Sequence, residues 1–176
     1  DETQASGDQY ESNNYCSQAA SLGAVTEGYE TVIPATTIYP GSDVDWYRIT
    51  VDELGEGSNT IKVKITLSNI PVGHDYDLCV WPENGSVTYS DKYGEEKVQT
   101  PKTCGELADF AGTGDEGECM DLNIFKLDTD EEVYTATWSA SDFANDDRTF
   151  IVKVFDYKED VDVQCTQPYT LTVQAY

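Results

Sequence analysis

Oxygen-bearing side chains gather in two short segments near the beginning of the chain. Glu11, Asn13 and Asn14 lie within four positions of one another, and Asp43 and Asp45 lead into an aromatic stretch. Because side chains alternate along a strand, Asp43 and Asp45 should lie on one side, directed at the edge of the core. Ca²⁺ accepts about six to eight carboxylate, amide and carbonyl oxygens in irregular geometry. The two segments could therefore share one calcium site.

The same residues also have a purely structural interpretation. Asn13 or Asn14 could cap a short helix from Tyr15 to Leu22, which Gly23 would end. The carboxylates could then simply be solvated, since the chain has 34 acids against 10 bases and chance pairs are expected.

Catalytic motifs are scarce. The single histidine, His74, lies in a turn, where a side chain is usually exposed, and a Ser-His-Asp or Cys-His enzyme would have to use it. No G-x-S-x-G sequence places a serine on a strand-to-helix turn. A two-carboxylate glycosidase has enough acids, but a domain of short strands has little room for a deep cleft. We expect no enzyme, with a small hydrolase using His74 as the alternative.

Charge limits the possible partners. The net charge of -24 repels phosphate backbones and anionic lipid headgroups, so we expect neither nucleic acid nor a membrane surface as partner. Such acidity is typical of proteins that work in salty water, where ions screen self-repulsion, and suggests a marine or salt-adapted bacterium.

The chain begins at Asp1 without Met, so we expect a processed or excised piece of a longer product.

Apolar residues alternate with polar ones over several stretches, which is the pattern of half-buried strands. We expect an antiparallel, jelly-roll-like β-sandwich with one short N-terminal helix. Residues 1–12 would form a linker that carries the first calcium ligands, and 13–176 a single domain with an irregular insertion at 82–119. The core stripes are Tyr47-Ile49-Val51, Ile61-Val63-Ile65-Leu67, Tyr76-Leu78-Val80, Phe150-Val152-Val154 and Tyr169-Leu171-Val173.

Five cysteines without a C-x-x-C pair favour disulfides in an exported protein over a zinc site. Cys104 and Cys119 bracket a glycine-rich loop, and a bridge there would contribute about 3 kcal/mol in the chain-entropy model. We predict that pair first. Cys16, Cys79 and Cys165 leave one over after a second bridge, for which Cys79 with Cys165 is possible.

Four stretches resemble the bacterial pre-peptidase C-terminal domain, a β-sandwich appended to secreted peptidases and other exported proteins. They are Asp8-Gln-Tyr-Glu11-Ser-Asn13-Asn14, Asp43-Val-Asp45-Trp46-Tyr47-Arg48-Ile49, Asp75-Tyr76-Asp77-Leu78 and Tyr169-Thr-Leu171-Thr-Val173. The resemblance covers about residues 8–81 and 148–176. In that family, and in related collagen-binding modules, a Glu-x-Asn-Asp/Asn segment supplies calcium ligands together with acids before an aromatic-rich strand.

The resemblance implies calcium ligands in this chain. The residues that match are Glu11, Asn13, Asn14 and Asp45. The chain also departs from the family, since Gln9 and Ser42 stand where some members have acids. Asp43 is the candidate replacement for the second of these.

The role implied by the resemblance is that of a non-catalytic accessory domain of a secreted protein, with a peptidase as the favoured parent. Apart from the resemblance, we expect the domain to be a monomer. It would help secretion or maturation, or attach the parent enzyme to a protein or polysaccharide substrate. Two alternatives remain open, a carbohydrate-binding module and a structural, adhesin-like module. A sugar-binding face would use aromatic residues on the outer side of the strands, where alternation places Trp46, Trp81 and Tyr157.

Overall fold

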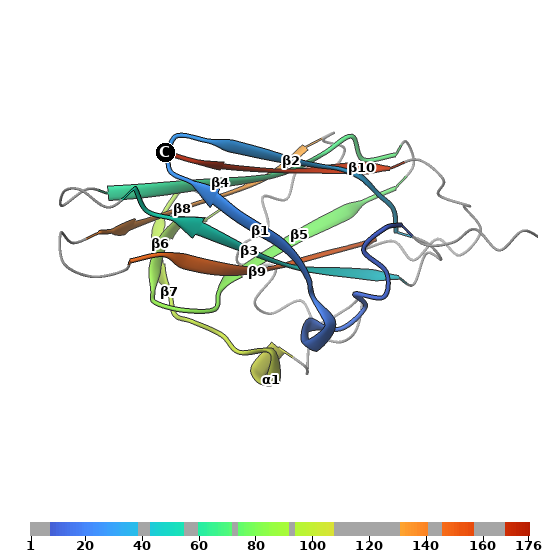
Figure 1. Ribbon diagram of the computed structural model, residues 1–176, viewed down its shortest axis with the longest axis horizontal. Coiled ribbons are helices and arrows are strands. Elements are labelled where there is room, and N and C mark those ends of the chain that lie inside the picture. The colour runs from blue at the N-terminus through green and yellow to red at the C-terminus, as the bar shows by residue number, and fades with distance from the viewer. Residues whose placement is uncertain are drawn as a thin grey trace, which may run out of the picture.

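The computed structural model describes residues 8–38, 43–54, 60–71, 74–91, 94–107, 131–140, 146–156 and 168–176. Within these ranges ten strands, a 3-10 turn η1 and one helical turn α1 make up the regular structure (Figure 1). The elements are η1 Cys16–Gln18, β1 Ala20–Thr26, β2 Glu30–Thr36, β3 Val44–Asp52, β4 Thr60–Ser68, β5 Tyr76–Pro82, β6 Val87–Ser90, β7 Glu96–Gln99, α1 Cys104–Leu107, β8 Glu131–Ser139, β9 Arg148–Asp156 and β10 Tyr169–Ala175.

The strands form two packed sheets, which confirms the predicted jelly-roll-like sandwich. One sheet has the order β1-β3-β9-β5 and the other the order β2-β10-β4-β8-β6-β7. From β2 to β5, and again from β8 to β10, consecutive strands alternate between the sheets. The pairing is antiparallel except between β1 and β3, which run parallel. This exception lays the N-terminal part of the chain along the edge of β3.

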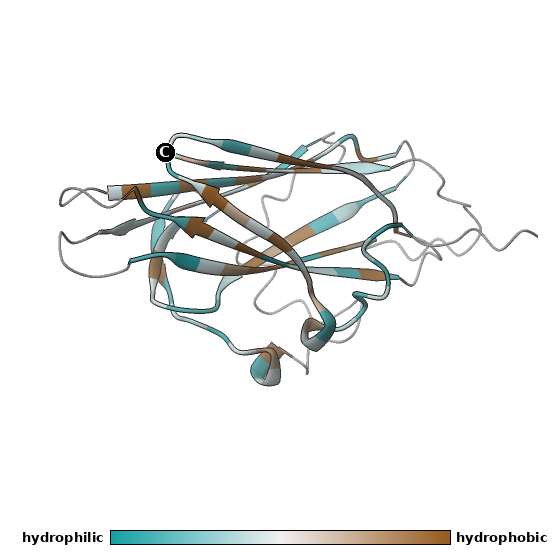
Figure 2. Ribbon diagram, in the orientation of Figure 1, coloured by the Kyte–Doolittle hydropathy of each residue, from teal (hydrophilic) through white to brown (hydrophobic). Residues whose placement is uncertain are grey.

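The main core lies between the sheets and consists of the alternating residues that the sequence indicates. Apolar residues recur along the strands of both sheets (Figure 2). In β10 every second residue is buried, from Tyr169 to Ala175, while the residues between them are partly exposed. All five predicted stripes contribute to this core.

A second, smaller core covers the outer face of the four-stranded sheet. It contains Cys16, Trp46, Cys79, Trp81, Leu107, Ile151 and Phe155. Trp46 and Trp81 stack with their rings 5.9 Å apart, and each is at most 2% exposed. Alternation correctly places both tryptophans on the outer side, but η1 and α1 cover that side. Tyr157 lies outside the described residues.

The predicted disulfide between Cys104 and Cys119 is wrong, because Cys104 is bonded to Cys16, 88 positions earlier in the chain. The N-terminal segment runs along β3 and brings Cys16 onto the face where α1 packs. Cys79 is also disulfide-bonded. Cys119 and Cys165 lie outside the described residues.

The predicted helix from Tyr15 to Leu22 is reduced to the single 3-10 turn η1, and Ala20 already begins β1. Tyr15 is the N-cap residue, and no side chain caps the turn. Pairing with β3 therefore prevails over the weak local helix signal.

Part of the predicted insertion joins the main fold. The hairpin of β6 and β7 extends the six-stranded sheet beyond β8. Among the described residues, no helix has the length and apolar character required to cross a membrane.

Phe150 provides a test of the main core. Its ring lies 6.3 Å from that of Tyr134 and 5.8 Å from that of Trp138, and the side chain is fully buried. Phe150→Ala should lower the free energy of unfolding by about 3–5 kcal/mol in urea denaturation. Val32→Ala, on the 51% exposed Val32 of β2, should change it by less than about 0.5 kcal/mol. Equal losses would contradict the assigned faces.

Candidate metal centre

Residues 8–15, which we call the leader, attach the N-terminal part of the chain to the sandwich. The backbone N–H of Trp46 donates to the carbonyl of Asn13 at 3.0 Å, and Nδ2 of Asn13 donates to the carbonyl of Trp46 at 3.2 Å. The ring of Tyr10 packs edge-on against Tyr47 at 5.7 Å. Asp8 accepts a hydrogen bond from the backbone N–H of Thr37 at 2.9 Å. The leader is therefore fixed on both sides of Glu11.

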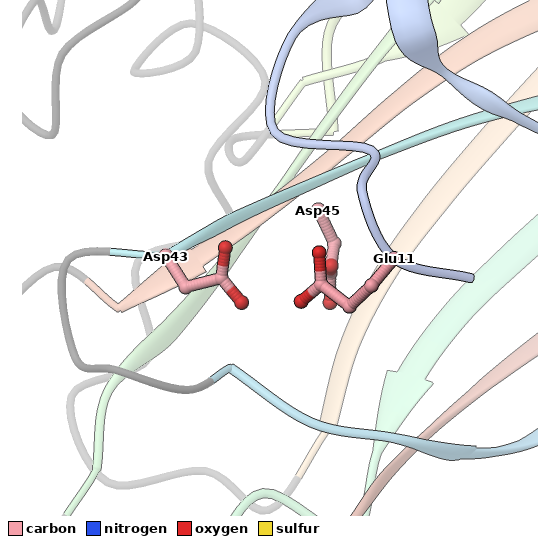
Figure 3. Close-up of side chains that lie close together, drawn as sticks. All are labelled: Glu11, Asp43 and Asp45. Carbon is pink, nitrogen blue, oxygen red and sulfur yellow. The ribbon is translucent and has the colours of Figure 1, made fainter. Parts of the chain in front are cut away.

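Three carboxylates converge where the leader meets the start of β3. Glu11 comes from the leader, Asp43 directly precedes β3, and Asp45 is the second residue of that strand. One carboxylate oxygen from each lies within 4.8 Å of the others (Figure 3). Asp43 and Asp45 are buried, whereas Glu11 is partly exposed. The structure thus brings together the two segments that the sequence predicts to share a site.

Asp45 is fully buried, and the core hydrogen-bonds only one side of its carboxylate. Its Oδ2 accepts a hydrogen bond of 2.6 Å from the hydroxyl of Tyr169, which lies 2.8 Å from the hydroxyl of Tyr47. Its Oδ1 is buried and accepts no hydrogen bond from any residue that the structure describes. A buried carboxylate oxygen without a donor is costly unless a proton or a cation compensates for it.

The two asparagines of the leader follow Glu11 closely in the chain, and their side-chain amides are further candidate ligands. Asn13 is fully buried, and its Oδ1 has no hydrogen-bond donor in the described part of the chain. The amide of Asn14 lies 3.3 Å from Oε2 of Glu11 and 2.9 Å from Oδ1 of Asp43. With its nitrogen toward them, the amide donates to both carboxylates, whereas the opposite orientation adds an oxygen to the cluster.

The clustered acids resist ionisation in the absence of a cation. Burial, then repulsion by Asp43, raises the pKa of Glu11 to about 7. Burial raises the pKa of Asp45 to about 8, helped by repulsion from Asp43 and opposed by the hydrogen bond from Tyr169. A bound cation would remove this repulsion and favour the ionised forms.

These donors fit a hard divalent cation. Every candidate ligand atom is oxygen, and two oxygens on opposite sides of Ca²⁺ lie roughly 4.6–5.2 Å apart, twice the usual Ca–O distance. The spacing of up to 4.8 Å among the three carboxylates agrees with that span. Within the described residues, this is the one group of three or more acids, histidines or cysteines with such spacing.

Two contributors were not found from the sequence. Asp8 lies close enough to raise the pKa of Asp45, and Tyr169 orients the Asp45 carboxylate from 124 positions away. Asp8 belongs to the same acidic segment as Glu11, so the sequence could have indicated that Asp8 lies near the site. No local pattern indicates Tyr169, because its role depends on how the two sheets pack.

A second group of ionisable residues lies at the N-terminal end of β5. The predicted exposure of His74 is wrong, because its side chain is 5% exposed and its Nδ1 lies 2.7 Å from Oδ2 of Asp156. Burial raises the pKa of Asp77 to about 7 and that of Glu132 to about 9, with added repulsion between acids. Glu132 accepts a 2.6 Å hydrogen bond from the backbone N–H of Leu78, so it joins β8 to the edge strand of the other sheet.

Comparison with known proteins gives no family for this chain. No family model matches it, and no curated protein matches it. A solved structure of a Bacillus thuringiensis Cry1Da tryptic core variant is similar over 90% of this chain, with 14% identity and a TM-score of 0.29. The match spans 24% of the toxin chain, and at this TM-score it supports no conclusion about fold or function.

The raised pKa values predict how stability depends on pH in calcium-free buffer. Asp45 and Glu11 have ordinary pKa values of 3.8 and 4.5, so the folded protein holds protons that the unfolded chain has already released. The free energy of unfolding should therefore fall as the pH rises from about 5 to about 8. Urea denaturation in chelator at several pH values measures this fall.

Asp45→Asn should reduce the dependence on pH, because it removes the group with the higher pKa. Asp52→Asn is the matched control, since it makes the same change at the opposite end of β3. Asp77 and Glu132 contribute to all variants alike and cancel in the comparison. The same slope in the Asp45 variant and the wild type would show that this carboxyl group is not protonated in the fold.

Proposed function

We propose that this chain is a non-catalytic accessory domain of a secreted protein, with a peptidase as the favoured parent, and that Ca²⁺ stabilises it. The ion binds between the leader and the start of β3, with Glu11, Asp43 and Asp45 as carboxylate ligands and Asn13 and Asn14 as amide ligands. The domain serves secretion or maturation of its parent protein, or attaches the parent to a protein or polysaccharide substrate. This is the role implied by the resemblance to the pre-peptidase C-terminal domain.

One observation carries the calcium proposal. The fully buried carboxylate of Asp45 has one oxygen without a hydrogen-bond donor among the described residues. Two further carboxylates lie close to it, with one oxygen of each within 4.8 Å of the others. A helix cap or a solvated turn would require none of this. Because Glu11 reaches the cluster from a different segment, a cation there would join the leader to the sandwich rather than stabilise one loop.

Two features support a secreted, non-catalytic domain. Disulfides form and persist mainly in oxidising compartments, and this chain has one between Cys16 and Cys104. His74, on which the alternative hydrolase depends, is buried in its contact with Asp156. A carbohydrate-binding module is also less favoured, because Trp46 and Trp81 are buried and cannot offer a sugar an aromatic face.

Calcium should raise the stability of the folded protein. If the ion binds only the native state, about a hundredfold excess over its dissociation constant adds about 2.7 kcal/mol to the free energy of unfolding. Thermal melting of chelator-treated protein, with and without added CaCl₂, measures the change.

Glu11→Gln should remove most of this gain, because the variant loses the carboxylate contributed by the leader. Glu30→Gln is the control, since Glu30 is exposed on β2 and the charge change is the same. A melting temperature that calcium leaves unchanged in the wild type, or raises equally in both variants, would contradict the proposed site.

Attachment can be separated from a role in secretion or maturation. The calcium-loaded domain should co-sediment with insoluble protein fibres or polysaccharide particles, and chelator should release it if the leader helps to form the binding face. Retention on neither material would argue against attachment and favour secretion or maturation as the role.

A further inference from the structure

The Cys16–Cys104 disulfide lies where the second, smaller core meets a surface pocket. The pocket has a volume of about 280 Å³ and is lined by residues of the leader, η1, β3 and α1. Both cysteines are part of the lining, next to Tyr15, which is 60% exposed. A thiol reagent that enters the pocket therefore lies against the two bonded residues, of which Cys104 is partly exposed and Cys16 is 5% exposed. Cys79, by contrast, is fully buried in its disulfide.

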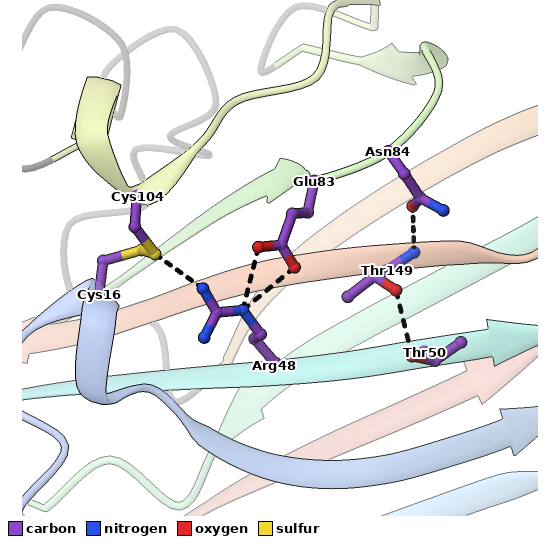
Figure 4. Close-up of polar contacts among 7 residues, drawn as sticks. All are labelled: Cys16, Arg48, Thr50, Glu83, Asn84, Cys104 and Thr149. Carbon is purple, nitrogen blue, oxygen red and sulfur yellow. Dashed lines mark hydrogen bonds and ion pairs between the residues drawn. A yellow bond between two sulfur atoms is a disulfide. The ribbon is translucent and has the colours of Figure 1, made fainter.

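A positive charge lies beside one of the two sulfurs. Nη2 of Arg48 donates a hydrogen bond of 2.8 Å to Sγ of Cys104 (Figure 4). Both carboxylate oxygens of Glu83 accept from Nε of Arg48 at 3.1 Å and hold the guanidinium in place. A cation beside a sulfur stabilises the thiolate, and a thiol of lower pKa is the better leaving group in disulfide exchange.

We propose that Cys16–Cys104 is a thiol-exchange site whose opening loosens the leader and weakens cation binding. A thiolate of a dithiol reductant attacks Sγ of Cys16 and forms a mixed disulfide with it. The bond to Cys104 breaks, and its electron pair leaves on Sγ of Cys104, beside the Arg48 guanidinium.

The second thiolate of the reductant completes the exchange. It attacks the reductant's own sulfur in the mixed disulfide, closes a disulfide within the reductant and releases Cys16, which takes a proton. The protein gains two electrons and the dithiol loses two. Of the two protons that the dithiol gives up, one ends on Cys16 and the other in solvent.

The link to cation binding, which rests on the proposed function, follows from the position of Cys16. It lies two positions after Asn14, and the hydrogen bonds of Asn13 to Trp46 lie between the disulfide and Glu11 along the leader. Opening the Cys16–Cys104 disulfide removes the attachment at one end of the leader. Ca²⁺ must then order a looser leader when it binds. By reciprocity, bound Ca²⁺ must disfavour reduction by the same factor.

The exchange is tested in calcium-free buffer, independently of any cation. Oxidised protein is treated with dithiothreitol, the free thiols are alkylated at intervals, and mass spectrometry identifies the modified cysteines. Cys16 and Cys104 should become modified at least about tenfold faster than Cys79. Equal rates, or earlier modification of Cys79, would overturn the proposal.

The role of the positive charge is tested at Arg48. Arg48→Gln should slow the opening several-fold, and Arg48→Lys should restore much of the rate, because it keeps the charge but not the paired contact with Glu83. If both variants open equally fast, the charge has no part in the exchange. Circular dichroism checks that each variant is folded, and the wild-type comparison with Cys79 stands even if one is not.

Coupling is tested by titrating CaCl₂ in a calorimeter into oxidised protein and into the double variant Cys16→Ser/Cys104→Ser. The variant should bind calcium about tenfold more weakly, within the usual range of coupling between sites. Equal affinity would overturn the coupling and leave the calcium site intact. Binding by neither form would overturn the calcium site and the coupling together, whereas the exchange result would stand.

Discussion

The structure depends on how the negative charge at the rim of the sandwich is compensated. Asp45 occupies a core position of β3, beside the tyrosines whose hydroxyls satisfy one of its oxygens. Two more carboxylates are held next to it by the leader and by the start of the strand. Three acids can share this space only as partly protonated groups or as ligands of a cation, because a buried, uncompensated charge is strongly unfavourable.

Because of this constraint, the attachment of the leader to the sandwich is a structural part of the fold. The hydrogen bonds of the leader to Trp46 continue the edge of the four-stranded sheet, and Cys16 then fixes it to α1. In the chain-entropy model, a bridge across a loop of this length contributes between about 4 and 5 kcal/mol. Both attachments act on one short segment. The backbone pairing brings Glu11 to the acids on β3, and the disulfide limits how far the segment can move when they ionise.

Most of the fold and part of the site could be predicted from the sequence. Alternation depends only on neighbouring residues, so it located the core stripes and placed Asp43 and Asp45 on one side of their strand. The disulfide partner of Cys104 could not be found in this way, because it depends on the path of a segment 88 positions away. The same holds for Tyr169 and for the cover over Trp46. The helix predicted after Asn14 is only a 3-10 turn in the structure, because pairing with β3 outweighs the weak local helix signal.

Under the proposed function, the disulfide and the bound calcium respond to the same change of surroundings. Disulfides persist mainly outside the reducing cytosol, and extracellular calcium modules bind in the range of about 10⁻⁴ to 10⁻³ M, so on this proposal the disulfide and the calcium contact both form after export. The rim is continuous with the main core, because Tyr10 of the leader packs against that core and Asp45 is hydrogen-bonded to Tyr169 inside it. The docked leader is therefore part of the folded sandwich rather than an addition to it.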